Sequence, residues 1–176
     1  MRWSIWGCVL LIAAEALLSF RSVSMAADNT SFITGRDAVE VWRGEIAGAK
    51  DSLLIVTLKL TTHKALKPLL EAHQGGVKVR LLLDGKEAAA PKSLARKARK
   101  AGIEVLVWPT DSLGELHAKF TVIDARELVA GSFNLSAAAA KSNTECVVIV
   151  TEPSAVESAV KSFYSLTAQA KPLNVE

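Results

Sequence analysis

Hydrophobic positions along the chain follow two different periods, and the two alternate. In some segments apolar residues recur every three or four positions, as on the buried face of an amphipathic helix. Other segments are apolar throughout or at every second position, as in buried or half-buried strands. The predicted helices span 36–49, 61–73, 92–101 and 154–168, and the predicted strands span 52–60, 77–84, 103–107, 118–123, 128–130 and 145–150.

The order of these segments predicts an α/β fold. Helices and strands alternate as far as residue 107, and three further strands then precede a last helix. This order is typical of a mixed β-sheet sandwiched between helices. The chain has 176 residues, half of them hydrophobic, which is enough for a hydrophobic core and excludes general disorder. We therefore predict a single domain over residues 27–176.

Residues 1–26 have the features of a segment that directs export. Arg2 gives a positive start, Ile5–Leu18 is mostly apolar, and Ser24-Met25-Ala26 resembles a small-x-small cleavage site. This pattern predicts a signal peptide cleaved after Ala26, and hence a periplasmic or secreted protein. The charges of Glu15 and Arg21 leave an uncleaved membrane anchor as the alternative.

Polar residues at fixed spacing mark the second half of the chain. His117, Lys119 and Asp124 form the pattern H-x-K-x4-D, and Gly131-Ser132-Phe133-Asn134 follows after six residues. In a strand, His117 and Lys119 point to the same face, while Ala118 points to the opposite, buried side. An imidazole, with a pKa of about 6.5, can attack phosphorus or protonate a leaving group, and the lysine ammonium can bind phosphate oxygens. The pattern therefore indicates phosphodiester chemistry.

The other residues of this pattern have structural as well as chemical interpretations. Asp124 has the wrong strand parity to share a face with His117, which favours a turn carboxylate that organises the backbone over a catalytic group. Gly131 allows close approach of the backbone, and Ser132 and Asn134 can donate hydrogen bonds to phosphate oxygens. The sequence has no H-E-x-x-H or C-x-x-C pattern, so it predicts no metal and no other cofactor.

The run from His117 to Asn134 resembles the HKD signature of the phospholipase D superfamily, and its single copy resembles the small bacterial endonuclease branch. This resemblance implies a phospholipase D-like fold and a covalent phosphohistidine. It also implies that Glu145 holds the second ring nitrogen of His117, although Cys146 stands where the family often has Asn; a solvated strand-end glutamate is the alternative. The candidate catalytic residues are His117, Lys119, Asp124, Ser132, Asn134 and Glu145.

One motif supplies one histidine, whereas the family's reaction uses two. The other histidines, His63 and His73, lie in a predicted helix without such a motif and are interpreted as helix-surface residues. A two-fold homodimer would bring two motifs together. His117 of one subunit is then the nucleophile and the partner subunit's His117 the general acid, while both Lys119 and both Asn134 side chains hold the phosphate.

Basic residues cluster in the predicted helix 92–101. They can follow a polyanionic backbone, or they can form an ordinary solvated helix face. Together with the motif they favour an endonuclease that hydrolyses DNA or RNA; the alternatives are hydrolysis of phospholipid and a catalytically silent nucleic-acid-binding dimer. Residues 111–115 are expected to rim the site. The candidate substrate-binding residues are Lys92, Arg96, Lys97, Arg99 and Lys100.

Overall fold

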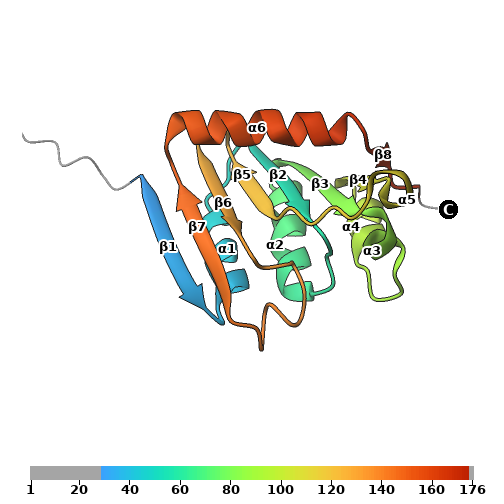
Figure 1. The fold of residues 1–176 in the computed structure, drawn as a ribbon, viewed down its shortest axis with the longest axis horizontal. Coiled ribbons are helices and arrows are strands. Elements are labelled where there is room, and N and C mark those ends of the chain that lie inside the picture. Colours follow the sequence, from blue (N-terminus) through green and yellow to red (C-terminus); the bar gives the residue numbers. More distant parts are fainter. Residues whose placement is uncertain (1–28, 175–176) are drawn as a thin grey trace, which may run out of the picture.

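A mixed sheet of eight strands forms the centre of residues 29–174, the part of the chain that the computed structural model describes (Figure 1). Its strand order is β1-β7-β6-β5-β2-β3-β4-β8. The neighbours β2, β3 and β4 are parallel, and all other neighbouring pairs are antiparallel. The strands are β1 (Thr30–Gly35), β2 (Ser52–Thr57), β3 (Lys78–Asp84), β4 (Glu104–Trp108), β5 (Phe120–Ile123), β6 (Glu127–Gly131), β7 (Glu145–Val150) and β8 (Lys171–Pro172).

Helices cover both faces of this sheet. The first two helices and α4 pack on one face, where Trp42, Leu66 and Ala98 share a core with alternate residues of the central strands. The last helix, α6, packs on the other face through Val156 and Phe163. The predicted sandwich is therefore confirmed. The helices are α1 (Ala38–Ile46), α2 (His63–Gln74), α3 (Gly85–Ala89), α4 (Ala95–Lys100), α5 (Thr110–Leu113) and α6 (Pro153–Thr167).

The central strand β2 is buried on both faces, which explains its continuous apolar run. Leu53 and Ile55 point into the core under α1 and α2, whereas Leu54 and Val56 point toward α6. Burying an aliphatic side chain of this size contributes roughly 1.5–3 kcal/mol. The sheet centre is thus a rigid base, and the functional groups lie where its strands end.

Two predicted strand boundaries are wrong, and both lie where the pairing of β2 with β5 ends. The pairing of β2 with β5 ends at the pair Val56–Phe120, so β5 starts at Phe120 rather than at Ala118. Ala118 is exposed and not buried as predicted. Beyond Thr57 the chain leaves the sheet instead of continuing to Leu60. Leu60 forms an isolated bridge with Leu135, and this contact draws the end of β2 toward the segment after the motif.

Other elements have no signal in the hydrophobic pattern. Strand β1 lies at the sheet edge with five of its six residues exposed, so it shows no buried face. Helices α3 and α5 have five and four residues, too few for a helical period. The predicted helix 92–101 begins only at Ala95, because the Leu94 amide donates to the Leu60 carbonyl (2.9 Å). The predicted signal peptide lies outside the described residues, and within residues 29–174 no helix is long and apolar enough to span a bilayer.

Candidate active site

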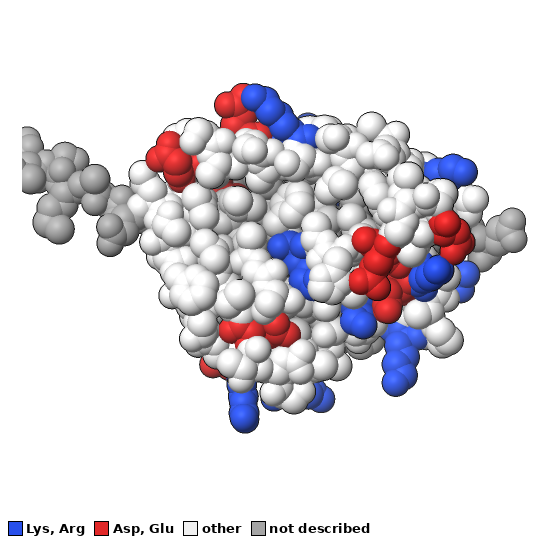
Figure 2. Space-filling view, viewed as in Figure 1, with Lys and Arg blue, Asp and Glu red and all other residues white. Residues whose placement is uncertain are grey.

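The motif residues other than Asp124 gather at one edge of the sheet, the lower edge in Figure 1. Strands β2 and β6 end there, while β5 and β7 begin there, as the pairs Val56–Phe120, Phe120–Ala130 and Gly131–Val147 establish. Segments far apart in the sequence therefore contribute neighbouring side chains. In the same orientation, Figure 2 shows basic side chains projecting along this edge, with acidic side chains just above them and at the right, whereas most of the remaining face carries no charge.

His117 and Lys119 lie side by side just before β5. The Lys119 ammonium lies 3.2 Å from Nδ1 of His117 and donates to the His117 carbonyl oxygen at 2.6 Å. The imidazole is 70% exposed, and its Nε2 is 3.8 Å from a carboxylate oxygen of Glu115. The juxtaposition predicted from strand parity is thus present, although both residues precede the strand itself. An accessible imidazole beside a cation is suited to attack on a bound phosphate.

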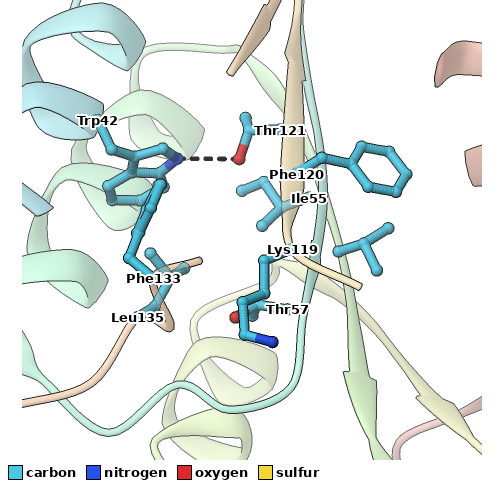
Figure 3. A pocket seen from close by; sticks show the side chains of 9 residues that line it. Trp42, Ile55, Thr57, Lys119, Phe120, Thr121, Phe133 and Leu135 are labelled. Atoms are coloured by element: carbon cyan, nitrogen blue, oxygen red, sulfur yellow. Dashed lines mark hydrogen bonds between the residues drawn. The ribbon is translucent and has the colours of Figure 1, made fainter. Parts of the chain in front are cut away.

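The aliphatic part of Lys119 is fixed by the core beneath it (Figure 3). Thr57, Phe133 and Leu135 line a void of about 10 Å³ under this side chain. The indole of Trp42, on α1, donates to the Thr121 hydroxyl at 2.9 Å and closes the base of the void. Lys119 therefore leaves the buried layer with its stem held and its ammonium directed to the edge of the sheet.

The ammonium of Lys119 is partly withdrawn from solvent. Burial lowers the pKa of Lys119 below its usual value; the carboxylates of Glu115 and Glu145 oppose this lowering, and the nearby charge of Lys59 adds to it. The two carboxylates and two ammonium groups therefore interact electrostatically at one site. Lys59, which follows β2, was not among the predicted site residues.

The segment from Gly131 to Asn134 is shaped by a close approach of two strands. A Cβ on Gly131 would lie 2.1 Å from the Cys146 carbonyl oxygen, so no larger residue fits without a backbone shift. Phe133 is buried, and the half-buried Asn134 has an Oδ1 atom that is inaccessible and lacks a hydrogen-bond partner within residues 29–174. Unsatisfied buried polar groups are uncommon in folded proteins. This oxygen is an acceptor, so the predicted donation from the Asn134 amide nitrogen to a phosphate oxygen stays a prediction.

Ser132 and Glu145 have different partners from those predicted. The Ser132 hydroxyl donates to Glu145 and accepts from the Cys146 amide (3.1 Å), so it does not donate to the open site. The other carboxylate oxygen of Glu145 accepts from Asn143 (2.9 Å). Glu145 is consequently held by Ser132 and Asn143 and not by a ring nitrogen of His117. Both residues share the site, and Ser132 fixes the position of the carboxylate.

Asp124 lies at the other end of β5 and does not share the site. It accepts hydrogen bonds from the amides of Lys50 (2.9 Å), Asp51 (2.8 Å) and Ser52 (2.8 Å). These bonds outweigh the cost of burial and hold the pKa of Asp124 below its usual value. Asp124 and Ala125 both have a φ of 51°, as in the tight turn of a hairpin. The backbone-organising interpretation is confirmed, and its place among the catalytic residues was wrong because β5 separates it from His117.

The predicted basic cluster is exposed, but it lies beside the site and not within it. Ala95 and Ala98 of α4 face the core, while Lys92, Arg96, Lys97 and Lys100 are exposed and Arg99 is half-buried. Among residues 111–115, Glu115 borders the imidazole as expected, whereas Asp111 pairs with Lys86 at 3.3 Å.

Asp84 is the main residue that sequence reasoning missed. This buried carboxylate accepts from the Lys86 amide (3.0 Å), the Glu87 amide (3.2 Å), the Thr110 hydroxyl (2.6 Å) and the Leu116 amide (3.0 Å). Leu116 is the residue before His117, so Asp84 anchors the approach to the imidazole. The sequence feature that could have identified it is an aspartate at the end of an apolar strand.

Within the described part of the chain, no group of three or more His, Cys, Asp or Glu side chains is arranged to hold a metal ion.

Comparison with known families agrees with this geometry. The family described as "Cardiolipin synthase, PLD-like domain" matches residues 43–167. The chain belongs to the phospholipase D superfamily. The resemblance of its single HKD motif is thereby confirmed.

Several proteins of this superfamily are similar to the chain. The mitochondrial cardiolipin hydrolase of Danio rerio is 30% identical over 131 residues, which are 74% of this chain and 57% of that protein. The same-named protein of Chlamydomonas reinhardtii is 33% identical over 69% of this chain and 53% of its own length. The phospholipase D of Rickettsia felis is 27% identical over 80% of this chain and 69% of its own length. The chain thus spans little more than half of each cardiolipin hydrolase.

Solved structures confirm the fold. The structure of Nuc, a phospholipase D family member from Salmonella typhimurium, has a TM-score of 0.76 at 23% identity and covers 83% of this chain and 99% of its own. NucT from Helicobacter pylori has a TM-score of 0.73 at 18% identity and covers 82% of this chain and 98% of its own. Both solved chains therefore match almost entirely within the described domain.

Proposed function

We propose that the protein is a phosphodiesterase that hydrolyses nucleic acid through a covalent phosphohistidine at His117. The observation that carries this proposal is the pairing of an exposed imidazole with the ammonium of Lys119, 3.2 Å away, at the edge of the sheet where the GSFN segment also lies. A bound phosphate competes with Nδ1 for this ammonium, because anionic oxygens are the stronger acceptors. Released from Lys119, Nδ1 can carry the ring proton and leave the Nε2 lone pair free to attack.

The reaction then proceeds in two balanced steps. Nε2 of His117 forms a bond to phosphorus while the bond to the leaving oxygen breaks, and that oxygen takes a proton from a second imidazolium. The second imidazole next removes a proton from water, which attacks phosphorus and releases His117. Lys119 and Asn134 stabilise the charge on the phosphate oxygens in both steps.

The second imidazole comes, in this proposal, from a second copy of the chain. The other histidines in the described region lie on α2: His63 is its first residue and His73 lies in its last turn. A charge-poor row of residues that begins next to Lys119 supports a contact between copies. Phe120, Ala130, Val148 and Phe32 pair in sequence across β5, β6, β7 and β1, and Phe32 is 67% exposed. Apolar surface of this kind is typical of homodimer interfaces.

Nucleic acid is the preferred substrate because cations lie near the site, exposed ones on α4 and the half-buried Lys59 after β2. The relatives from Danio rerio and Rickettsia felis, a cardiolipin hydrolase and a phospholipase D, favour the second candidate, hydrolysis of phospholipid. The deciding experiment offers plasmid DNA, RNA and vesicles of cardiolipin and phosphatidylcholine in parallel, with EDTA present. We expect cleavage of nucleic acid, and cleavage of lipid alone would refute this preference.

Two variants separate chemistry from assembly. His117→Ala should be inactive yet have the mass of a dimer by analytical ultracentrifugation, and retained hydrolysis would exclude the phosphohistidine. Phe32→Glu should become monomeric and inactive while it stays folded; an active monomer would contradict the shared site and the binding-module alternative alike.

We also propose export by way of residues 1–26, which N-terminal sequencing of protein recovered outside the cytoplasm would test.

A further inference from the structure

A groove of about 410 Å³ lies beyond the end of β2, and one of its lining residues, Lys59, is close enough to Lys119 to lower its pKa. Small apolar residues form much of its wall, and lysines lie among its lining residues. This volume is within the range of about 300–1,000 Å³ that small-ligand sites occupy. The residues that matter for its chemistry are Lys59, Glu87, Pro91, Lys92, Ala137 and Ala138.

The groove is continuous with the phosphate site through the backbone. Leu60 bridges to Leu135, and the Thr61 amide donates to the Leu135 carbonyl at 2.8 Å. One wall of the groove thus continues directly from Asn134, and the other continues from Thr57, which lies under Lys119.

We propose that this groove holds the nucleotide next to the scissile phosphate in a single-stranded nucleic acid, with Lys59 and Lys92 binding the flanking phosphates. The inference rests on the proposed function and adds strandedness and a binding subsite to it. An apolar wall of Ala and Pro can pack against an unpaired base through van der Waals contacts, while cations contact the backbone on either side. A base in a duplex would carry its partner strand, for which a groove of this size has no room.

Charge favours a nucleotide over an acyl chain in the groove. Lys59 is half-buried and pairs with Glu87 at 3.6 Å, and Lys92 is exposed at the start of the basic cluster that continues along α4. Partly exposed ion pairs contribute little stability, so a phosphate can replace Glu87 as the partner of Lys59. The pKa of Lys119 is lowered in part by Lys59, which supports their proximity.

The test compares two substrates for each of three variants of the full chain. Lys92→Ala removes an outer cation, and Ala137→Trp fills the groove. Lys161→Ala removes another exposed lysine, paired with Glu157, from α6 on the opposite face of the sheet. The substrates are a single-stranded oligonucleotide and bis(4-nitrophenyl) phosphate, which has no neighbouring nucleotide. The measured quantity is the ratio of kcat/KM for the oligonucleotide to kcat/KM for the small diester.

We expect this ratio to fall about tenfold in Lys92→Ala and in Ala137→Trp, chiefly through KM, and to stay at the wild-type value in Lys161→Ala. Lys92→Ala should also reduce the slope of log KM against log salt by about 0.7, as for one lost phosphate contact on a single strand. An unchanged ratio in both groove variants would overturn the subsite and leave the nuclease proposal standing. An equal loss on both substrates, or a loss seen only on lipid vesicles, would likewise overturn it. A wild-type protein that cleaves the small diester but no nucleic acid would instead refute the proposed function.

Discussion

Replacing Asp84 by Asn tests how the approach to His117 is held in place. The substitution keeps the shape of the side chain but exchanges one acceptor oxygen for an amide nitrogen. In one orientation that nitrogen faces the amides of Lys86 and Glu87; in the other it faces the Leu116 amide and the Thr110 hydroxyl. At least one donor therefore loses its acceptor whichever way the amide lies.

The magnitude follows from the number and kind of these bonds. Hydrogen bonds to a charged partner contribute about 1.5–3 kcal/mol each, and Asp84 is also the N-cap of α3. We expect the free energy of unfolding to fall by about 2–4 kcal/mol in Asp84→Asn. Because a displacement of about 1 Å can cost about 10²-fold in rate, loosening the backbone at Leu116 should also lower kcat on a small diester by at least about tenfold.

The pH dependence gives this prediction a distinct signature. Burial opposes ionisation of Asp84, but hydrogen bonds from Thr110, Leu116, Glu87 and Lys86 outweigh it and hold its pKa below the usual value. Such a carboxylate stabilises the fold above its unfolded pKa of about 3.9, and this stabilisation is lost as the pH falls through the folded-state pKa. The difference between wild type and variant should be full at pH 7 and should shrink below about pH 4.

Urea unfolding followed by tryptophan fluorescence measures this difference, and steady-state kinetics at pH 7 measures kcat. Asp111→Asn is the matched control, since Asp111 is a carboxylate of the same region that is 91% exposed. It should change the unfolding free energy by less than about 0.5 kcal/mol. If Asp84→Asn is as stable as this control at pH 7 and keeps the wild-type kcat, Asp84 does not anchor the site.

Two further predictions concern the charge at Lys119 and the hairpin after β5. Glu115 opposes the lowering of the Lys119 pKa, so Glu115→Gln should shift the alkaline limb of the pH–rate profile to lower pH; an unchanged limb would mean that Lys119 does not control it. Ala125 has a φ of 51°, which costs an L-residue with a side chain about 1–2 kcal/mol. Ala125→Gly should therefore stabilise the protein by about 0.5 kcal/mol after the larger entropy of glycine in the unfolded chain is included, and denaturant midpoints will show whether it does.

The fold class could be predicted because the signals that specify it are local. Runs such as residues 53–56 are apolar at every position, since both faces of β2 are buried between helical layers. The elements that were not predicted have no such signal. Strand β1 exposes nearly all its residues at the sheet edge, and α5 has a single turn. Their positions are set by partners distant in sequence, such as the pairing of Phe32 with Val148.

The sequence by itself determined which chemistry-bearing residues the site has: the spacing of His117 and Lys119 places an imidazole and an ammonium together, and Gly131 marks a close approach of strands. Only the tertiary structure decided the partners of these residues. It assigned Ser132 to Glu145, placed Asp124 at the far end of β5, and brought Asp84 to the amide before His117. The physical reason is that residue type and periodicity record which face of an element is buried, whereas a hydrogen bond between segments depends on where sheet pairing ends each strand.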